Sequence, residues 1–169
     1  MRSKKKNILK IAIDSPAAAG AGTQAKLISK HFNLLQLDTG RCYRYIANIK
    51  ITNPSNYNYT FIKKKISKLN IKKLQNRNLL TDRVATTASE IAKDRRIRKL
   101  VHKFQQKWAL HPPKKYSGSI LDGRDITSVQ LKNAMFKFFI TASLKARAKR
   151  RFYEYKSLKK KISMKDVLK

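Results

Sequence analysis

The sequence predicts an α/β fold with a parallel sheet, in a single domain spanning residues 1–169. Three observations indicate this fold. A short apolar run is followed by a loop of small residues and then by a helical pattern. A second apolar run follows that helix, so residues 8–37 have the size of one strand-helix-strand unit with a right-handed crossover. Two later apolar runs are each followed by polar residues, as expected where parallel strands end at a ligand site.

The first unit of the predicted sheet consists of two strands and one helix. Ile8–Ile13 is expected to be a buried strand because it is mostly apolar and stops at Asp14. The pattern becomes helical over Thr23–Phe32, where apolar residues recur at one- and four-residue offsets. Leu34–Leu37 is the second strand candidate, and a strand that follows a crossover helix pairs in parallel.

The middle and the end of the chain are expected to be mainly helical. Asn53–Asn78 is rich in Asn, Lys and Tyr, only Tyr59–Leu69 within it is amphipathic, and we expect it to be mobile. The remaining patterns predict two helices, at Val84–Ala92 and Arg95–Leu110, and then two buried strands, at Ser119–Leu121 and Phe136–Ile140. A last long helix is expected from Ser143 to about Leu158.

The composition excludes several classes of protein. A single cysteine, Cys42, rules out an internal disulfide framework, and three scattered histidines offer no zinc spacing. No apolar run approaches the roughly 18 residues of a membrane helix, so we expect a soluble, cytoplasmic protein with no membrane partner. The net charge of +32 suggests a nucleic acid or an anionic surface as partner. AT-rich codons, which favour Lys, Asn and Ile together, explain the same charge without any partner. We favour this explanation, because the basic residues recur along almost the whole chain instead of forming one tail.

The loop after the first strand is the first candidate for a functional site. Small residues let backbone N–H groups and a helix N-terminus surround an oxyanion. Against the pattern G-x-x-x-x-G-K-[ST], Ser15 replaces the first glycine, Gly20 matches the second and Ala21 replaces the lysine. Alone, such a turn is also common without any ligand. The residues predicted to bind phosphate are Ser15, Pro16, Ala17, Ala18, Ala19, Gly20, Ala21, Gly22 and Thr23.

Several blocks, in order, resemble the bacterial cytidylate kinases, which are P-loop nucleoside monophosphate kinases. They are Ile11–Lys26, the run Leu37-Asp38-Thr39-Gly40-Arg41-Cys42-Tyr43-Arg44, Leu80–Val84 with Ala88, Ser89 and Arg98, Asp122–Ile126, and Lys137–Ser143 with Arg147, Arg150 and Arg151. They cover most of the chain outside Asn48–Asn78. The resemblance implies a three-layer α/β/α fold with a reduced monophosphate-binding region at 48–93 and a lid-like helix at 143–161.

The resemblance also implies an activity and a set of site residues. The activity is phosphorylation of CMP or dCMP with ATP and Mg²⁺, in a protein that acts as a monomer. The acceptor nucleotide would contact Thr39, Arg44, Ser89, Arg98, Asp122, Arg124 and Asp125. Ser89, Arg98 and Asp125 would bind its cytosine base. Within this set, Arg44 and Arg124 would hold the phosphate, because guanidinium groups form paired hydrogen bonds with its oxygens. Arg124, with the lid residues Arg147, Arg150 and Arg151, would be catalytic, and Thr23 would help to hold Mg²⁺.

The sequence departs from the family pattern in two important places. Ala21 stands where the family has a lysine that bridges the terminal phosphates, and Lys26 is a weak substitute on another side of the helix. The family also continues beyond the equivalent of Lys169 into a helix with an R-D-x-x-D-x-x-R motif, a strand and a helix. We therefore expect reduced activity, and a sheet without its final strand. Thr127-Ser128, where the family has Gly-Thr, is a milder departure.

Two alternatives remain open on the sequence alone. One is a degenerate, non-catalytic protein of the same fold that binds nucleotides, or RNA nonspecifically through its basic surface. The other is adenylate kinase, because the loop from Gly20 to Ala25 is similar to the loop of that family. Asp38-Thr39-Gly40 with Tyr43-Arg44, together with the block from Asp122 to Asp125, favours cytidylate kinase over adenylate kinase.

Overall fold

The computed structural model describes residues 8–157 and 162–168. The expected last residue of the long helix, Leu158, lies outside this range. The strands are β1 (Leu9–Asp14), β2 (Leu34–Asp38), β3 (Gly118–Gly123) and β4 (Phe136–Phe139). The α-helices are α1 (Ala21–His31), α2 (Gly40–Thr52), α3 (Tyr59–Ser67), α4 (Asp82–Ile91), α5 (Arg95–Leu110), α6 (Leu144–Ser157) and α7 (Met164–Leu168). Short turns of 3-10 helix lie at Pro54–Asn56, Ile71–Gln75 and Arg77–Leu80, and a π-helical turn at Ile126–Gln130.

The four strands form one parallel sheet in the order β2-β3-β1-β4. β1 and β3 are central, with Ile11 opposite Ile120 and Asp14 opposite Gly123. All four strands therefore end at the same edge of the sheet. The predicted α/β class with a parallel sheet is confirmed.

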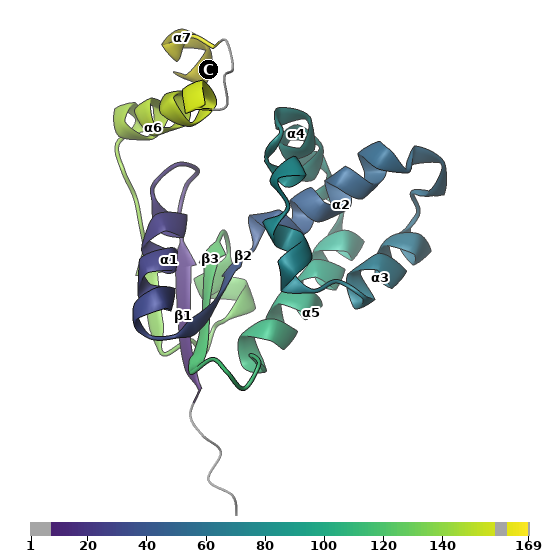
Figure 1. Cartoon of the computed structure of the whole chain (residues 1–169), viewed down its shortest axis with the longest axis vertical. Helices are drawn as coiled ribbons and strands as arrows, with labels where there is room; N and C mark the ends of the chain where they lie inside the picture. Colours follow the sequence, from purple (N-terminus) through teal and green to yellow (C-terminus); the bar gives the residue numbers. More distant parts are fainter. Residues whose placement is uncertain (1–7, 158–161, 169) are drawn as a thin grey trace, which may run out of the picture.

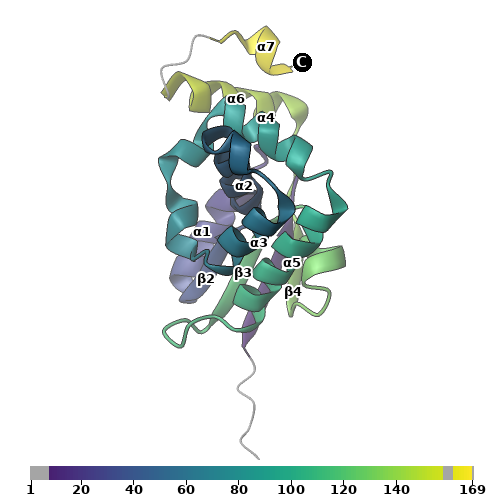
Figure 2. The same ribbon diagram turned by 90° about the vertical axis from the view of Figure 1, so that its right-hand side faces the viewer.

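Helices cover both faces of the sheet (Figures 1 and 2). Because side chains alternate along a strand, Ile11 and Ile13 of β1 pack with Ala25 of α1, while Ala12 points to the opposite face. There it joins a larger cluster built from α2, α3, α4 and α5. Figure 2 shows these helices in front of the strands, and Figure 1 shows α6 and α7 above the sheet.

The expected mobile segment instead packs into the large cluster. Ile62, Ile66, Leu69 and Leu74 are buried there, so the expectation of mobility is wrong. The asparagines in this segment cap helical turns, because the side chains of Asn58, Asn70 and Asn76 each accept a hydrogen bond from a backbone N–H of the turn that follows. A composition typical of a loop is here the composition of a chain of short, capped helices.

Two further elements differ from the prediction. Helix α2 was not expected, although Cys42, Ile46 and Ile49 recur at helical spacing and are buried. Strand β4 forms where expected, but all four of its residues are exposed instead of buried. It pairs with β1 on one side, as an edge strand, so its apolar residues do not indicate burial.

Candidate active site

The small-residue loop connects β1 to α1 at the carboxyl edge of the sheet. It is a tight turn, in which the Ala19 amide donates to the Pro16 carbonyl at 3.3 Å and the Thr23 amide donates to the Gly20 carbonyl at 3.1 Å. Ala18 and Gly20 have positive φ angles of 58° and 100°. This alternation of left-handed and right-handed backbone forms the kind of concavity that binds anions.

Asp14 fixes the loop after β3 to the end of β1. One carboxylate oxygen accepts from the Ile126 amide at 2.6 Å, and the other accepts from both the amide and the hydroxyl of Thr127. The Ser15 amide donates to the Gly123 carbonyl at 3.0 Å. The phosphate loop and the Asp-Gly-Arg-Asp turn are therefore held side by side. From the sequence, Asp14 is expected only to end the strand, although an acid at this place also fits such a role.

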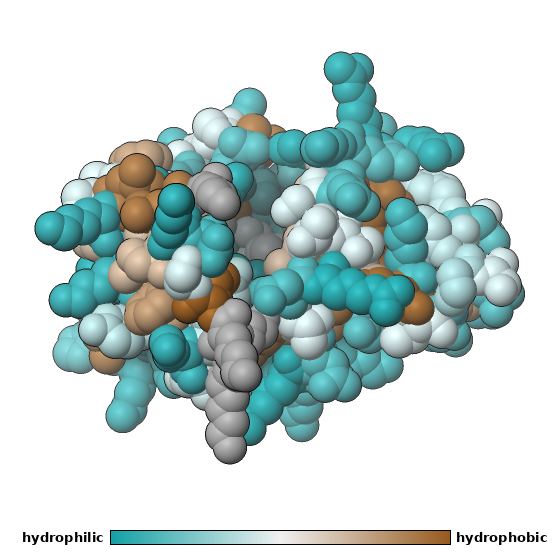
Figure 3. Space-filling model, turned by 90° about the horizontal axis from the view of Figure 1, so that it is seen from above, coloured by the Kyte–Doolittle hydropathy of each residue, from teal (hydrophilic) through white to brown (hydrophobic). Residues whose placement is uncertain are grey.

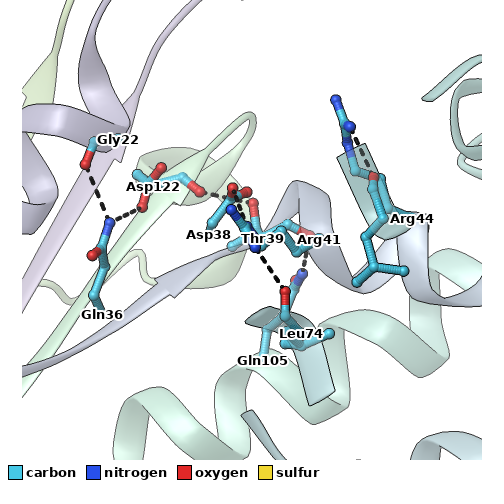
Figure 4. A network of polar contacts seen from close by, with 10 residues as sticks. Gly22, Gln36, Asp38, Thr39, Arg41, Arg44, Leu74, Gln105 and Asp122 are labelled. Atoms are coloured by element: carbon cyan, nitrogen blue, oxygen red, sulfur yellow. Dashed lines mark hydrogen bonds and ion pairs between the residues drawn. The ribbon is translucent and has the colours of Figure 1, made fainter. Parts of the chain in front are cut away.

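Asp122 is buried between the phosphate loop and β2 (Figure 4). Gln36 Nε2 lies 3.5 Å from Asp122 Oδ1 and 3.3 Å from the Gly22 carbonyl oxygen. Burial, with a smaller contribution from the charge of Asp38, raises the pKa of Asp122 to about 7. This carboxyl group therefore gains and loses its proton near neutral pH. Gln36 was missed by sequence analysis because a polar residue inside a short strand gives no specific signal.

Thr39 joins the turn after β2 to the end of β3. Its amide and its hydroxyl each donate to the Asp122 carbonyl at 3.0 Å, and its own carbonyl accepts from Gln105 Nε2 at 3.1 Å. A Cβ placed on Gly123 would lie 1.9 Å from Thr39 Oγ1, so only glycine fits there. The Asp-Thr-Gly and Asp-Gly-Arg-Asp motifs consequently form one interlocked unit.

Two of the three predicted cytosine-binding residues are brought together. Arg98 Nη2 and Asp125 Oδ2 form an ion pair of 2.8 Å, although both side chains are partly exposed. Asp125 has a left-handed φ of 58°, which turns the chain into the π-helical turn. Ser89, the third residue, is exposed and its hydroxyl donates to the Ala85 carbonyl of its own helix at 3.2 Å.

Arg44 points from α2 toward the 3-10 turns (Figure 4). Its Nη1 donates to the Leu79 carbonyl at 3.0 Å, and burial lowers the pKa of its guanidinium group. Arg41, one turn earlier, donates to the Leu74 carbonyl at 2.9 Å and to Asp38 at 3.3 Å. Arg124, the other predicted phosphate ligand, is exposed.

The three arginines of α6 do not form one cluster. Arg150 Nη1 donates to the carbonyls of Ala19 at 2.7 Å and Ala18 at 3.3 Å, directly on the phosphate loop. Arg151 pairs instead with Glu154 at 2.9 Å, and the Nε atom of Arg147 is buried without a partner among the described residues. Within residues 8–157 and 162–168, no group of three metal-binding side chains gathers, and no helix is long and apolar enough to cross a membrane.

The family model that matches this chain is that of cytidylate kinase, and it aligns with residues 11–169. The chain belongs to the cytidylate kinase family. A cytidylate kinase of Clostridium botulinum strain Hall is 36% identical over 95% of this chain and 77% of its own length. A cytidylate kinase of Rhodospirillum rubrum is 35% identical over 94% of this chain and 75% of its own, and one of Bartonella tribocorum is 38% identical over 85% and 66%.

These relationships confirm the family predicted from the sequence blocks and its class, a nucleotide phosphotransferase. The fold of a nucleoside monophosphate kinase is confirmed with it. Adenylate kinase, the near rival, is not the family found. The roles of the individual site residues stay predictions, as does the effect of Ala21 in the loop.

Proposed function

We propose that this cytidylate kinase homologue transfers the γ-phosphoryl group of ATP to CMP or dCMP. The observation that carries the proposal is the Asp14 clamp, which holds the phosphate loop against the Asp-Gly-Arg-Asp turn. Phosphoryl transfer depends mostly on positioning and on stabilising charge around the transferred group. A fixed donor loop beside a fixed acceptor turn supplies the first of these requirements.

On the donor side, backbone amides of residues 15–23 would bind the ATP phosphates at the start of α1. Mg²⁺ fits the oxygen donors here. The Thr23 hydroxyl belongs to the first turn of α1. The Asp122 carboxylate comes close to this turn, since its Oδ2 lies 3.6 Å from the position that a Cβ on Gly22 would take. When bound, Mg²⁺ would neutralise charge on the phosphates. The neighbouring cation would also lower the pKa of Asp122 and keep its carboxylate ionised.

On the acceptor side, Arg44 and Arg124 would bind the monophosphate of CMP. The Arg98–Asp125 pair would bind cytosine, with the Asp125 carboxylate accepting from the exocyclic amino group. Thr39 and Asp122 hold the two motifs together beneath this site. Ser89 would have to exchange its bond to Ala85 for one to the base.

We propose that the rate is reduced, because Ala21 supplies no charge to the phosphates. Loss of one preorganised electrostatic group costs on the order of 10²–10³ in rate. The test is ADP formation by the purified chain with CMP, dCMP, UMP and AMP as acceptors. We expect turnover with CMP or dCMP well above that with UMP or AMP. A protein that binds CMP but shows no CMP-dependent turnover would contradict catalysis and leave nucleotide binding.

A second candidate function is nonspecific RNA binding, which the basic surface favours. Polar side chains project over much of the face in Figure 3. A cavity of about 420 Å³ on α5 is lined mainly by cationic side chains, namely Arg95, Arg98, Lys99 and Lys103, with His102, Gln106 and Val129. RNA binding that weakens steeply with salt would support this function.

We further propose that the protein acts as a monomer in the cytoplasm.

A further inference from the structure

A cavity of about 560 Å³ lies between α2 and the 3-10 turns that follow α3. Its lining includes polar side chains from both, namely Tyr45, Asn48, Asn70, Lys72, Lys73 and Asn76. None of the lining residues belongs to the predicted ATP or CMP site. The volume is typical of a small-molecule site, and it leaves room beside a phosphate group for the rest of a molecule.

Two arginines of α2 fix the turns that form this cavity. Arg41 Nη1 donates to the Leu74 carbonyl at 2.9 Å, and Arg44 Nη1 donates to the Leu79 carbonyl at 3.0 Å. The side chains of both leucines are buried. The cavity is therefore preformed, and a ligand would not have to order its walls.

The capping bonds make two asparagines of the lining into hydrogen-bond donors. Asn70 Oδ1 accepts from the Lys73 amide at 3.1 Å, and Asn76 Oδ1 accepts from the Asn78 amide at 2.9 Å. Because each cap uses the amide oxygen, the Nδ2 group keeps both of its N–H donors, and no hydrogen bond engages them within residues 8–157 and 162–168. A ligand rich in acceptors suits such a wall.

The cavity also carries positive charge that no acid neutralises. Lys72 and Lys73 line it, and none of its lining residues is acidic. Neither lysine forms an ion pair in the described part of the chain. Burial raises the pKa of Tyr45, so its hydroxyl keeps its proton and adds a further donor. Two full charges and several neutral donors fit a phosphate dianion.

We propose that this cavity binds the phosphate group of a small phosphate monoester, at a site separate from those proposed for ATP and CMP. Lys72, Lys73 and the asparagine amides would hold the phosphate. Tyr45 would contact the group that carries it, because a tyrosine ring packs against apolar or planar groups and also offers a hydroxyl. The inference does not depend on turnover of CMP.

The test maps binding by amide NMR of the isotope-labelled full chain, titrated with ribose 5-phosphate at fixed ionic strength. We expect saturable shifts in residues 70–79 and around Tyr45 and Asn48 of α2. The map separates this cavity from residues 15–23, so phosphate bound at the proposed ATP site is not mistaken for it. An absence of saturable shifts in residues 70–79 up to about 10 mM ligand would overturn the proposal.

A pair of double variants separates the cavity from the general basic surface. K72A/K73A removes two charges from the lining, and K63A/K64A removes the same two charges from exposed positions on α3. We expect the dissociation constant to rise about tenfold or more in the first and less than about threefold in the second, because only the first loses charge-assisted contacts. Equal increases would show attraction to the basic surface as a whole and refute the site.

An uncharged substitution tests the wall itself. Asn48→Leu keeps the net charge and replaces a half-buried amide of the lining by an apolar side chain of similar size. We expect the dissociation constant to rise about threefold or more, with the amide spectrum away from the cavity unchanged as the check on folding. An unchanged dissociation constant would contradict binding inside the cavity, since attraction by the lysines alone needs no wall.

Two further ligands distinguish the sources of the phosphate. Inorganic phosphate that binds as tightly as ribose 5-phosphate would overturn the role given to Tyr45. An RNA homopolymer that shifts residues 70–79 when ribose 5-phosphate does not would overturn the proposal in favour of nucleic-acid binding. Turnover of CMP is measured separately. Shifts without turnover refute the proposed function alone, and turnover without shifts refutes the cavity site alone.

Discussion

At the scale of single residues, the site is organised by buried and half-buried side chains that the ligands would not touch. Asp14, Gln36 and Gln105 hold the ends of three neighbouring strands through bonds to backbone groups and to Asp122. Mutations at these positions should therefore affect both folding and catalysis. Substitution of an exposed residue that is predicted to bind the acceptor, such as Arg124, should affect catalysis alone.

The protonation of Asp122 should make stability depend on pH. Its pKa is about 7 in the folded chain and near the ordinary carboxyl value of 3.8 in the unfolded chain, so the folded state holds its proton more tightly. The stabilisation is fully present below about pH 4 and is lost as pH rises through 7. Asp122→Asn should remove this dependence and raise the free energy of unfolding at pH 8 by up to about 4 kcal/mol. Urea titrations of both proteins at pH 5 and pH 8 measure it, and parallel pH profiles would contradict the assignment.

Removal of the Asp14 carboxylate should loosen the turn after β3. Asp14→Ala leaves the first amides of the π-helical turn without their acceptor, and each lost bond to a charged group costs about 1.5–3 kcal/mol. We expect a loss of roughly 3–6 kcal/mol and a lower kcat, because Arg124 and Asp125 lie on this turn. Thermal unfolding and turnover are the measurements. Glu90→Ala, an exposed site on α4, is the control, and a similar small effect in both variants would argue against the clamp.

At the scale of elements, local caps stabilise the helices that replace the expected loop. Asn58 accepts from the Phe61 amide at 2.9 Å at the start of α3. Asn58→Ala should lower the free energy of unfolding by about 1 kcal/mol, whereas Asn56→Ala, which removes an exposed side chain two residues earlier, should change it by less than about 0.5 kcal/mol. Denaturant titration of the two variants distinguishes them. Equal losses would show that the cap contributes nothing.

The sequence predicted the elements whose patterns are local and missed those set by packing. The strand-loop-helix unit follows from an apolar run and small residues, so β1, α1 and β2 were found. Helix α2 was missed because Tyr43, Tyr45 and Ile51 carry no strong helix preference, and its burial against α4 decides the structure. The burial of β4 was overestimated because strand order is not a local property.

The candidate site was predictable where short motifs specify it. The phosphate loop, Thr39, Arg98 and Asp125 were predicted from short blocks of sequence, and their roles stay predictions. The contact of Arg150 with the loop joins positions more than a hundred residues apart, and no spacing indicates it. The burial of Asp122 likewise depends on three strands meeting in one order.

At the scale of the whole molecule, the net charge of +32 should oppose folding through repulsion between like charges. Raising the ionic strength from about 0.01 M to about 0.15 M shortens the range of this repulsion from about 30 Å to about 8 Å. The melting temperature should therefore rise with NaCl over this range. Sucrose at matched osmolality is the control for solvent effects, and a melting temperature that falls with salt would contradict net repulsion.

The positive charge has a second effect at the exposed edge strand β4. Phe136, Phe138 and Phe139 are 51%, 45% and 73% exposed, beside backbone groups that could pair with another strand. Lys137 stands between two of these phenylalanines, as a charge that discourages edge-to-edge pairing. The positive surface therefore helps to keep copies of the chain apart, so its solubility should depend on the same lysines that first suggested a nucleic-acid partner.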